Sequence, residues 1–469
     1  MSIQLPLNQK FANSATSRVK MAPHDSSAPG TLVRSRSGAD LLAIGLATSA
    51  AMWTVGYLCR MPGTGVPAPV ILTILLSLLF FGGVAATART DRNFWAGAMT
   101  GLIAGGFNLL ILGSLGHDLT TDRRMIGYAV VWVPITLAIS AILGLLGAGV
   151  GRWLNPSRRR KMDGIAALTA TTALATLVLV LAGGMVTGLN AGLSVPDWPD
   201  TFHYGMFVFP LSHMTGGVYY EHTHRLLATL VGLGTLVQTI YIFISESRKW
   251  VKALAATALL MVVAQGLLGG LRVTGHLTLA QARSHMDPST TLAIVHGALG
   301  QLFFGVLVAL AAICSWSWRF GPQSVAKASA RLDRTLAWSL VALLTVQLTI
   351  GSVLRHIGMV LAVHISVAVV VLLLCLFVGV RAWGMNPNSQ ILQRVGLSLL
   401  GVVTLQVLLG VAAVVAIGGQ GPITHPSMGQ AIVTTAHQVT GAILLAMAVL
   451  TACWFTRLHR PLPMRELGL

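Results

Sequence analysis

Twelve apolar stretches, each long enough to cross a bilayer as a helix, alternate with polar segments along most of the chain. A spanning helix needs about 20 apolar residues, because the hydrocarbon core is about 30 Å thick. Only helices satisfy their backbone polar groups within one such segment. The pattern predicts an all-α polytopic membrane protein with about twelve transmembrane helices. The stretches lie at about 40–59, 67–88, 94–115, 126–150, 164–187, 215–244, 252–273, 291–315, 335–355, 359–380, 395–417 and 430–455.

Composition supports this fold class. Hydrophobic residues make up 54% of the 469 residues and charged residues only 9%, whereas soluble domains carry about 25% charged residues. The four cysteines are Cys59, Cys314, Cys375 and Cys453. They lie singly in apolar segments without a CxxC pair, which indicates neither a disulfide framework nor a thiolate metal site.

The formal net charge of +18 is unevenly distributed. With the N-terminus inside, 24 of the 31 Lys and Arg residues fall on the inner side. This asymmetry predicts a cytoplasmic N-terminus under the positive-inside rule, and it makes nucleic-acid binding unnecessary as an explanation of the charge. We therefore expect a bacterial plasma-membrane protein with cytoplasmic tails at 1–39 and 456–469. Because residues 1–39 contain Arg and Ser and few acids, a mitochondrial presequence, with the inner membrane as location, is the alternative.

Four predicted spans each carry one histidine near the outer end. The four are His224, His296, His364 and His437. In the sequence, His224 and His296 are nearly as far apart as His364 and His437. The distance between the members of different pairs, His224 to His364 and His296 to His437, is also nearly equal. Near-equal spacing at both levels predicts an internal duplication. The segments Gln265–Gly269 and Gln406–Gly410 repeat a Gln-x-Leu-Leu-Gly pattern at the same offset between the halves.

The duplication divides the chain into parts. It predicts two four-helix units, at 164–315 and 335–455, in which the second and fourth helices carry the histidines. The spans within residues 40–151 contain no membrane histidine and do not join this pattern. They are predicted to form an additional four-helix module, whose role is unknown. A basic cytoplasmic linker at 152–163 separates this module from the first unit.

Ionisable side chains inside spans are costly and are functional candidates by default. A single histidine of this kind could make an interhelical hydrogen bond or reach toward the interface. Two pairs at one depth, facing each other in helical bundles, are typical of the axial ligands that hold haem iron in membrane cytochromes. We expect either two haems or one prosthetic haem and one haem substrate, toward the outer face. Copper or zinc is less favoured because a third ligand at helical spacing is missing.

The segment Glu221-His222-Thr223-His224-Arg225 contains two histidines. Only His224 preserves both spacings, so His222 is expected to point elsewhere, toward the outer interface. Glu221 lies one turn from His224 on the same helical face. It either forms an ion pair with Arg225 or acts beside the haem in proton handling or charge stabilisation.

These residues resemble a known family. Glu221-x-x-His224-Arg225 is similar to the ExxHR motif of haem A synthases, and Gly183–Pro199 resembles the first helix and outer loop of that family. The resemblance covers about 164–455. Two departures are that Thr187 stands where the family usually has arginine, and that the loop at 188–214 lacks the cysteine pair of some members.

The resemblance implies an oxidoreductase that converts the C8 methyl of haem O to a formyl group, giving haem A for terminal oxidases. It implies His224 and His296 around the substrate haem, His364 and His437 on a permanent haem b, and a catalytic Glu221. Arg225, Arg272 and Arg355 are candidates for propionate binding because guanidinium binds carboxylates bidentately. Their alternative role is interfacial anchoring.

Further partners follow from the same resemblance. Electrons would come from a separate, ferredoxin-like protein, and haem O synthase and cytochrome oxidase assembly factors would be neighbours in the bilayer. The rival hypothesis is a bis-histidine, cytochrome b-type electron carrier without substrate chemistry. It explains the histidines equally well but accounts for neither Glu221 nor the Asp197-Trp198 pair in the outer loop.

Overall fold

The computed structural model describes residues 38–90, 93–118, 122–154, 162–274, 289–418 and 425–462. Nearly all of the predicted N-terminal tail, most of the basic linker and the second half of the C-terminal tail lie outside these ranges. Gly38–Leu469 form one compact unit.

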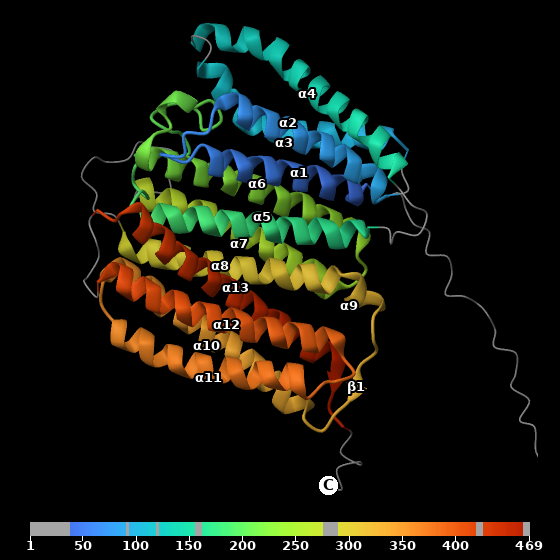
Figure 1. The fold of residues 1–469 in the computed structure, drawn as a ribbon, viewed down its shortest axis with the longest axis vertical. Coiled ribbons are helices and arrows are strands. Elements are labelled where there is room, and N and C mark those ends of the chain that lie inside the picture. Colours follow the sequence, from blue (N-terminus) through green and yellow to red (C-terminus); the bar gives the residue numbers. More distant parts are fainter. Residues whose placement is uncertain are drawn as a thin grey trace, which may run out of the picture. The chain divides into compact units, whose positions relative to one another are not determined.

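Within the described ranges, twelve long helices lie where twelve spans were predicted (Figure 1). Eleven are long and apolar enough to cross a membrane, and α3 is apolar over Trp95–Ile111. The chain is therefore an all-α, multi-pass membrane protein, as predicted. The helices are α1 (Ala39–Cys59), α2 (Ala68–Ala88), α3 (Trp95–Asp118), α4 (Asp122–Trp153), α5 (Gly164–Gly188), α6 (Gly216–Ser245), α7 (Lys249–Thr274), α8 (Thr290–Cys314), α10 (Ala330–Ile357), α11 (Leu361–Gly384), α12 (Gln390–Ile417) and α13 (Met428–Leu458).

Several elements outside the apolar stretches were not predicted. They are the short helices η1 (Leu211–His213) and α9 (Trp316–Phe320), and a two-residue parallel pair between β1 (Val325–Ala326) and β2 (His459–Arg460). In addition, α10 and α12 each begin about one turn before the predicted apolar run. Their first turns are polar, so hydrophobicity alone does not mark them as helical.

Helix α13 connects the two predicted four-helix units. It packs against α5 and α8 of the first and against α10 and α12 of the second. Leu307 of α8, Leu340 of α10 and Leu445 of α13 are completely buried in one shared apolar core. The two units therefore pack as one body.

The N-terminal module contacts the rest of the protein mainly through α1, which packs along α5 and touches α6. The Tyr219 hydroxyl donates a 2.5 Å hydrogen bond to the carbonyl oxygen of Tyr57, and the two rings stack. Leu46 of α1 lies against Gly234 of α6. These contacts attach the N-terminal module to α6 of the first unit.

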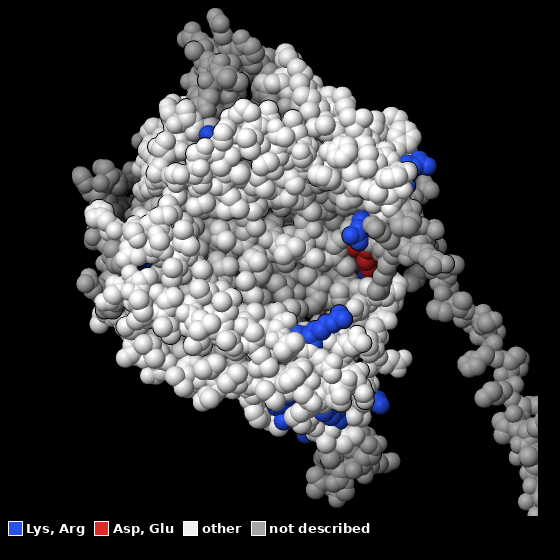
Figure 2. All heavy atoms as spheres, viewed as in Figure 1, with Lys and Arg blue, Asp and Glu red and all other residues white. Residues whose placement is uncertain are grey.

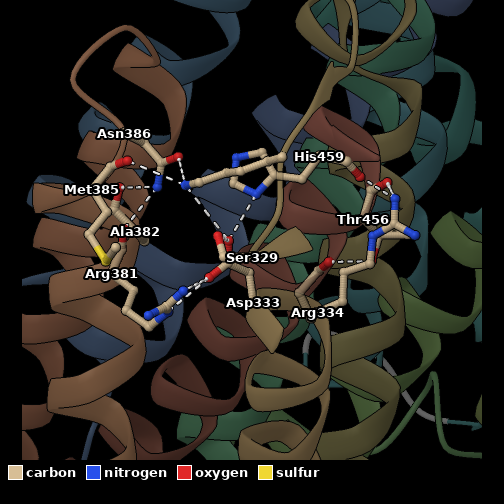
Figure 3. A network of polar contacts seen from close by, with 11 residues as sticks. Ser329, Asp333, Arg334, Arg381, Ala382, Met385, Asn386, Thr456 and His459 are labelled. Atoms are coloured by element: carbon tan, nitrogen blue, oxygen red, sulfur yellow. Dashed lines mark hydrogen bonds and ion pairs between the residues drawn. The ribbon is translucent and has the colours of Figure 1, made fainter. Parts of the chain in front are cut away.

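A buried carboxylate ties together the end of the second unit that lies opposite to the histidine pair (Figure 3). Asp333, in the first turn of α10, is 2% exposed. Arg381 of α11 donates two hydrogen bonds to its Oδ1, of 2.8 and 2.5 Å, and Ser329 donates one of 2.9 Å to its Oδ2. The His459 Nδ1 atom, after α13, lies 3.3 Å from Oδ2. These partners compensate the cost of burying the charge and explain why α10 extends beyond its apolar run.

Candidate functional site

The four sequence-predicted histidines form two facing pairs. His224 of α6 and His296 of α8 have ring centroids 6.4 Å apart and ring planes at 77°. His364 of α11 and His437 of α13 have the same distance and the same angle. Both pairs thus bring together histidines that are far apart in the sequence, with the same distance and angle between the rings.

Capped helix starts fix the height of two of these histidines, His296 and His437. The Ser289 side chain caps α8 by accepting a hydrogen bond from the Leu292 N–H, which fixes the beginning of that helix about two turns before His296. Ser427 and Gln430 form a capping box at the start of α13, about three turns before His437. Such caps satisfy backbone N–H groups that a helix leaves unpaired at its start.

Each histidine ring lies on a glycine of the preceding long helix. An added Cβ would lie 2.9 Å from the ring Cε1 atom at Gly183, 3.6 Å at Gly269, 3.1 Å at Gly351 and 3.1 Å at Gly410. The rings they face are those of His224, His296, His364 and His437, in that order. Glycine lets an imidazole approach the neighbouring helix backbone closely, so these contacts restrict the orientation of each ring.

The surroundings of the Nδ1 atom differ between the four rings. The Nδ1 atoms of His224, His296 and His437 are buried and have no hydrogen-bond partner among the described residues. For His364, the Gln347 amide nitrogen lies 3.2 Å from Nδ1 and donates a 2.9 Å hydrogen bond to the backbone carbonyl of the same residue.

The geometry also fits a metal held between two imidazoles. Metal–imidazole bonds are about 2 Å long, so the centroids of two rings on opposite sides of one metal atom lie roughly 6 Å apart. The observed 6.4 Å agrees with this in both pairs. The residues therefore fit a bis-histidine haem in each unit.

Glutamine side chains next to two of the rings were not given a role from the sequence. The Gln265 amide donates a 3.0 Å hydrogen bond to the His296 carbonyl oxygen, and Gln347 does the same at His364. For Gln265 the Gln-x-Leu-Leu-Gly pattern was the available signal: its glutamine contacts the histidine helix and its glycine faces the ring.

Glu221 lies buried in the second turn of α6, with 4% of its surface exposed. One carboxylate oxygen accepts a 2.9 Å hydrogen bond from the Val195 N–H, and the other pairs with Arg225 at 2.8 Å. Arg225 also donates to the carbonyl oxygens of Asp197 and Asp200, at 2.7 and 3.0 Å. The ion pair considered from the sequence is present, and both side chains hold the outer loop.

The outer loop is held at further points. The Asp197 carboxylate accepts hydrogen bonds from the backbone N–H groups of Phe202 and His203, at 2.8 and 2.7 Å. The Trp198 indole lies so close to Gly270 of α7 that an added Cβ would be 2.6 Å from its ring. The Asp-Trp pair thus anchors the loop over the outer ends of α6 and α7.

The expected position of His222 was wrong. Its side chain is fully buried rather than directed to the outer interface. Its Nδ1 atom lies 3.0 Å from the Thr201 hydroxyl, and its ring packs on Phe209 with centroids 4.9 Å apart. The fold of the outer loop, which covers this side of α6, is the reason.

The other two predicted arginines have different surroundings. The Arg272 guanidinium lies against Gly192 of the outer loop, and its Nε atom is buried without a hydrogen-bond partner among the described residues. Arg355 of α10 reaches the first unit, where it donates to the Thr187 carbonyl and to Asn190 Oδ1, the latter at 2.8 Å. Arg355, from the second unit, therefore contacts Thr187, the residue that stands where haem A synthases usually have an arginine.

Fold and site together define a multi-pass helical membrane protein with two transmembrane histidine pairs. Residues 166–365 match the model of a family described as cytochrome oxidase assembly protein. Over 126 residues the chain is 28% identical to haem A synthases from two strains of Cereibacter sphaeroides. These comparisons confirm the resemblance to haem A synthases for part of the chain. The matched segment is 26% of this chain and about a third, 32%, of the length of those relatives.

Proposed function

We propose that this protein is a haem A synthase that oxidises the C8 methyl of haem O to a formyl group. His224 and His296 would bind the substrate haem, and His364 and His437 would bind a permanent haem b. The observation that carries the proposal is the repeated pairing of imidazoles at 6.4 Å. A bound haem b would supply one-electron redox chemistry. Electrons would come from a separate protein, because no dinucleotide fingerprint occurs in a strand–helix context.

The protein residues around the first pair have separate tasks in this proposal. Glu221 would stabilise positive charge that develops at the oxidised carbon, or carry a proton outward. The outer loop, held by Trp198 and Arg225, would exclude water from the substrate. Arg272 would pair with a haem propionate, because its Nε atom is buried without a hydrogen-bond partner and no carboxylate lies within ion-pair distance among the described residues.

A bis-histidine electron carrier is the second candidate, since it needs only the two pairs. Extracted pigment distinguishes the two functions. In a host that makes haem O but lacks its own haem A synthase, we expect expression of this chain to yield haem A or the hydroxylated haem O intermediate, detected by mass spectrometry of the solvent extract. An extract that contains haem B and haem O alone would contradict the enzyme and favour the carrier.

The glycine contacts lead to a prediction for the second pair. In the Gly410→Ala protein, the new methyl group would press on the His437 ring at 3.1 Å and displace it. We expect a changed low-spin haem spectrum and a shifted reduction potential, measured by redox titration of the purified protein. Gly401→Ala, in the same helix with nothing within 4 Å of its added Cβ, is the matched control. Identical spectra and potentials for both variants would mean that the glycine does not position the ring.

A further inference from the structure

An open pocket of about 360 Å³ lies at the end of the helices opposite to the histidine pairs. Three segments form it: the turn after α6, helix α9, and the last turn of α13. The side chains used below are Arg248 from the first segment, Trp318 and Arg319 from the second, and Arg457 from the third. The pocket therefore joins both predicted four-helix units, and nothing in the haem chemistry uses it.

Positive charge exceeds negative charge at this pocket. Arg248 pairs with Glu246 through two bonds of 2.6 and 3.0 Å, and hydrogen bonds from Arg248 hold the pKa of that carboxyl below its usual range. Arg319 pairs with Asp163. Three guanidinium groups thus have two carboxylates beside them.

Of these three arginines, Arg457 has no compensating acid among the described residues. Its Nε atom donates a 3.2 Å hydrogen bond to the Trp318 carbonyl oxygen, and within the described ranges no carboxylate lies within 4.0 Å of its guanidinium. The Nε atom of Arg319, in contrast, is buried and has no partner in those ranges. The terminal N–H groups of Arg457 are therefore donors for an anion from outside the protein.

The position suits an anion at a membrane surface. In Figure 2, most charged side chains of the visible face gather along the edge where α9 and β1 lie in Figure 1. Under the predicted orientation this edge faces the cytoplasmic leaflet, whose anionic lipids attract basic segments near the bilayer.

The pocket borders an exposed apolar surface, with which a free inorganic anion would make no favourable contact. Phe243 and Ile244, directly before its first segment, are 48% and 79% exposed. On the α9 side, Trp316 and Phe320 are 49% and 48% exposed, which is typical of aromatic side chains at a membrane interface. A ligand with both a phosphate and acyl chains would contact both surfaces.

We propose that this pocket binds the headgroup phosphate of an anionic phospholipid. The guanidinium of Arg457 would hold the phosphate oxygens, with Arg248 and Arg319 at its sides, because guanidinium groups bind phosphate bidentately. The acyl chains would lie along the exposed apolar side chains beside α6 and α9. A lipid bound here would link the first unit to the second, independently of whether haem A synthesis is the activity.

Titration of the full-length protein in neutral detergent tests the proposal, with bound lipid counted by native mass spectrometry. We expect phosphatidylglycerol to bind about tenfold more tightly than phosphatidylcholine with the same acyl chains, since only the former has a net negative headgroup. Inorganic phosphate in millimolar excess should not displace it. Equal affinity for the two lipids would overturn the proposal, and displacement by phosphate would identify a free-anion site instead.

A pair of variants locates the binding. Arg457→Gln should weaken phosphatidylglycerol binding about tenfold by removing one charge-assisted contact. Arg394→Gln, at an exposed position near the same end of α12, removes one arginine outside the pocket and should leave the affinity unchanged. If Arg457→Gln does not fold, Arg457→Lys keeps the charge, loses the bidentate geometry, and should weaken binding by a smaller factor. The same affinity in the parent and in the folded Arg457 variant would place the lipid elsewhere.

Discussion

The Glu221→Gln protein is expected to keep its haem, to lose haem A formation by a factor on the order of 10²–10³, and to accumulate haem O or its alcohol intermediate. Glutamine has the shape of glutamate and can still accept the hydrogen bond from Val195 N–H, so the outer loop should stay attached. What disappears is the negative charge. Haem content by absorption and product by mass spectrometry of the extract measure the two effects separately.

The Glu221–Arg225 ion pair provides the comparison variant. Arg225→Gln removes the ion pair together with the hydrogen bonds to the Asp197 and Asp200 carbonyl oxygens, but it leaves the carboxylate. It therefore tests the attachment of the loop, whereas Glu221→Gln tests the charge. We expect Arg225→Gln to reduce haem A yield less than Glu221→Gln does. Equal losses in the two variants would make the ion pair and the attachment of the loop the requirement, and not the carboxylate charge as such. An undiminished yield in Glu221→Gln would leave Glu221 as a structural partner only.

Removal of one imidazole from the second pair should have the other large effect. We expect His364→Ala or His437→Ala to abolish the low-spin bis-histidine spectrum of that unit, because one axial ligand is lost and the remaining ring cannot complete the coordination. Absorption spectra of the reduced and oxidised purified protein provide the measurement. Unchanged spectra in both variants would show that these histidines do not bind haem.

His222 is the control for this experiment. Because its buried ring contacts Thr201 and Phe209, an alanine there would leave a cavity and an unpaired hydroxyl. His222→Gln keeps a polar partner for Thr201 and is the milder change. We expect it to retain both haem spectra and to lower thermal stability modestly. Loss of a haem spectrum in this variant alone would mean that His222, and not His224, is the ligand.

The apolar runs predicted the helices well because each spanning helix must satisfy its own backbone hydrogen bonds. The runs do not mark the polar first turn of α10, which is stabilised by the contact of Asp333 with Arg381, 48 residues further along the chain. Neither do they mark α9, whose five residues are too few for a periodic pattern. Such elements depend on partners that no local window contains.

The histidine positions were also accessible from the sequence, because duplicated spacing places equivalent residues at equivalent heights. The spacing could not show what surrounds each ring. The whole outer loop separates Gly183 from His224, whereas only a short turn between two helices separates Gly351 from His364, so the two contacts look unrelated in the sequence. Only the packing of adjacent helices brings each glycine to the Cε1 edge of an imidazole.

By itself, then, the sequence determined the fold class, the helices and the two sets of histidines, since hydrophobic length and spacing are local properties. The tertiary structure decided the rest. It placed His222 in the interior, joined Arg355 to Thr187 far along the chain, and brought the ends of α6, α9 and α13 around one pocket. These contacts arise from the way in which helices and the outer loop pack, and packing depends on the shapes of surfaces that lie far apart in the chain.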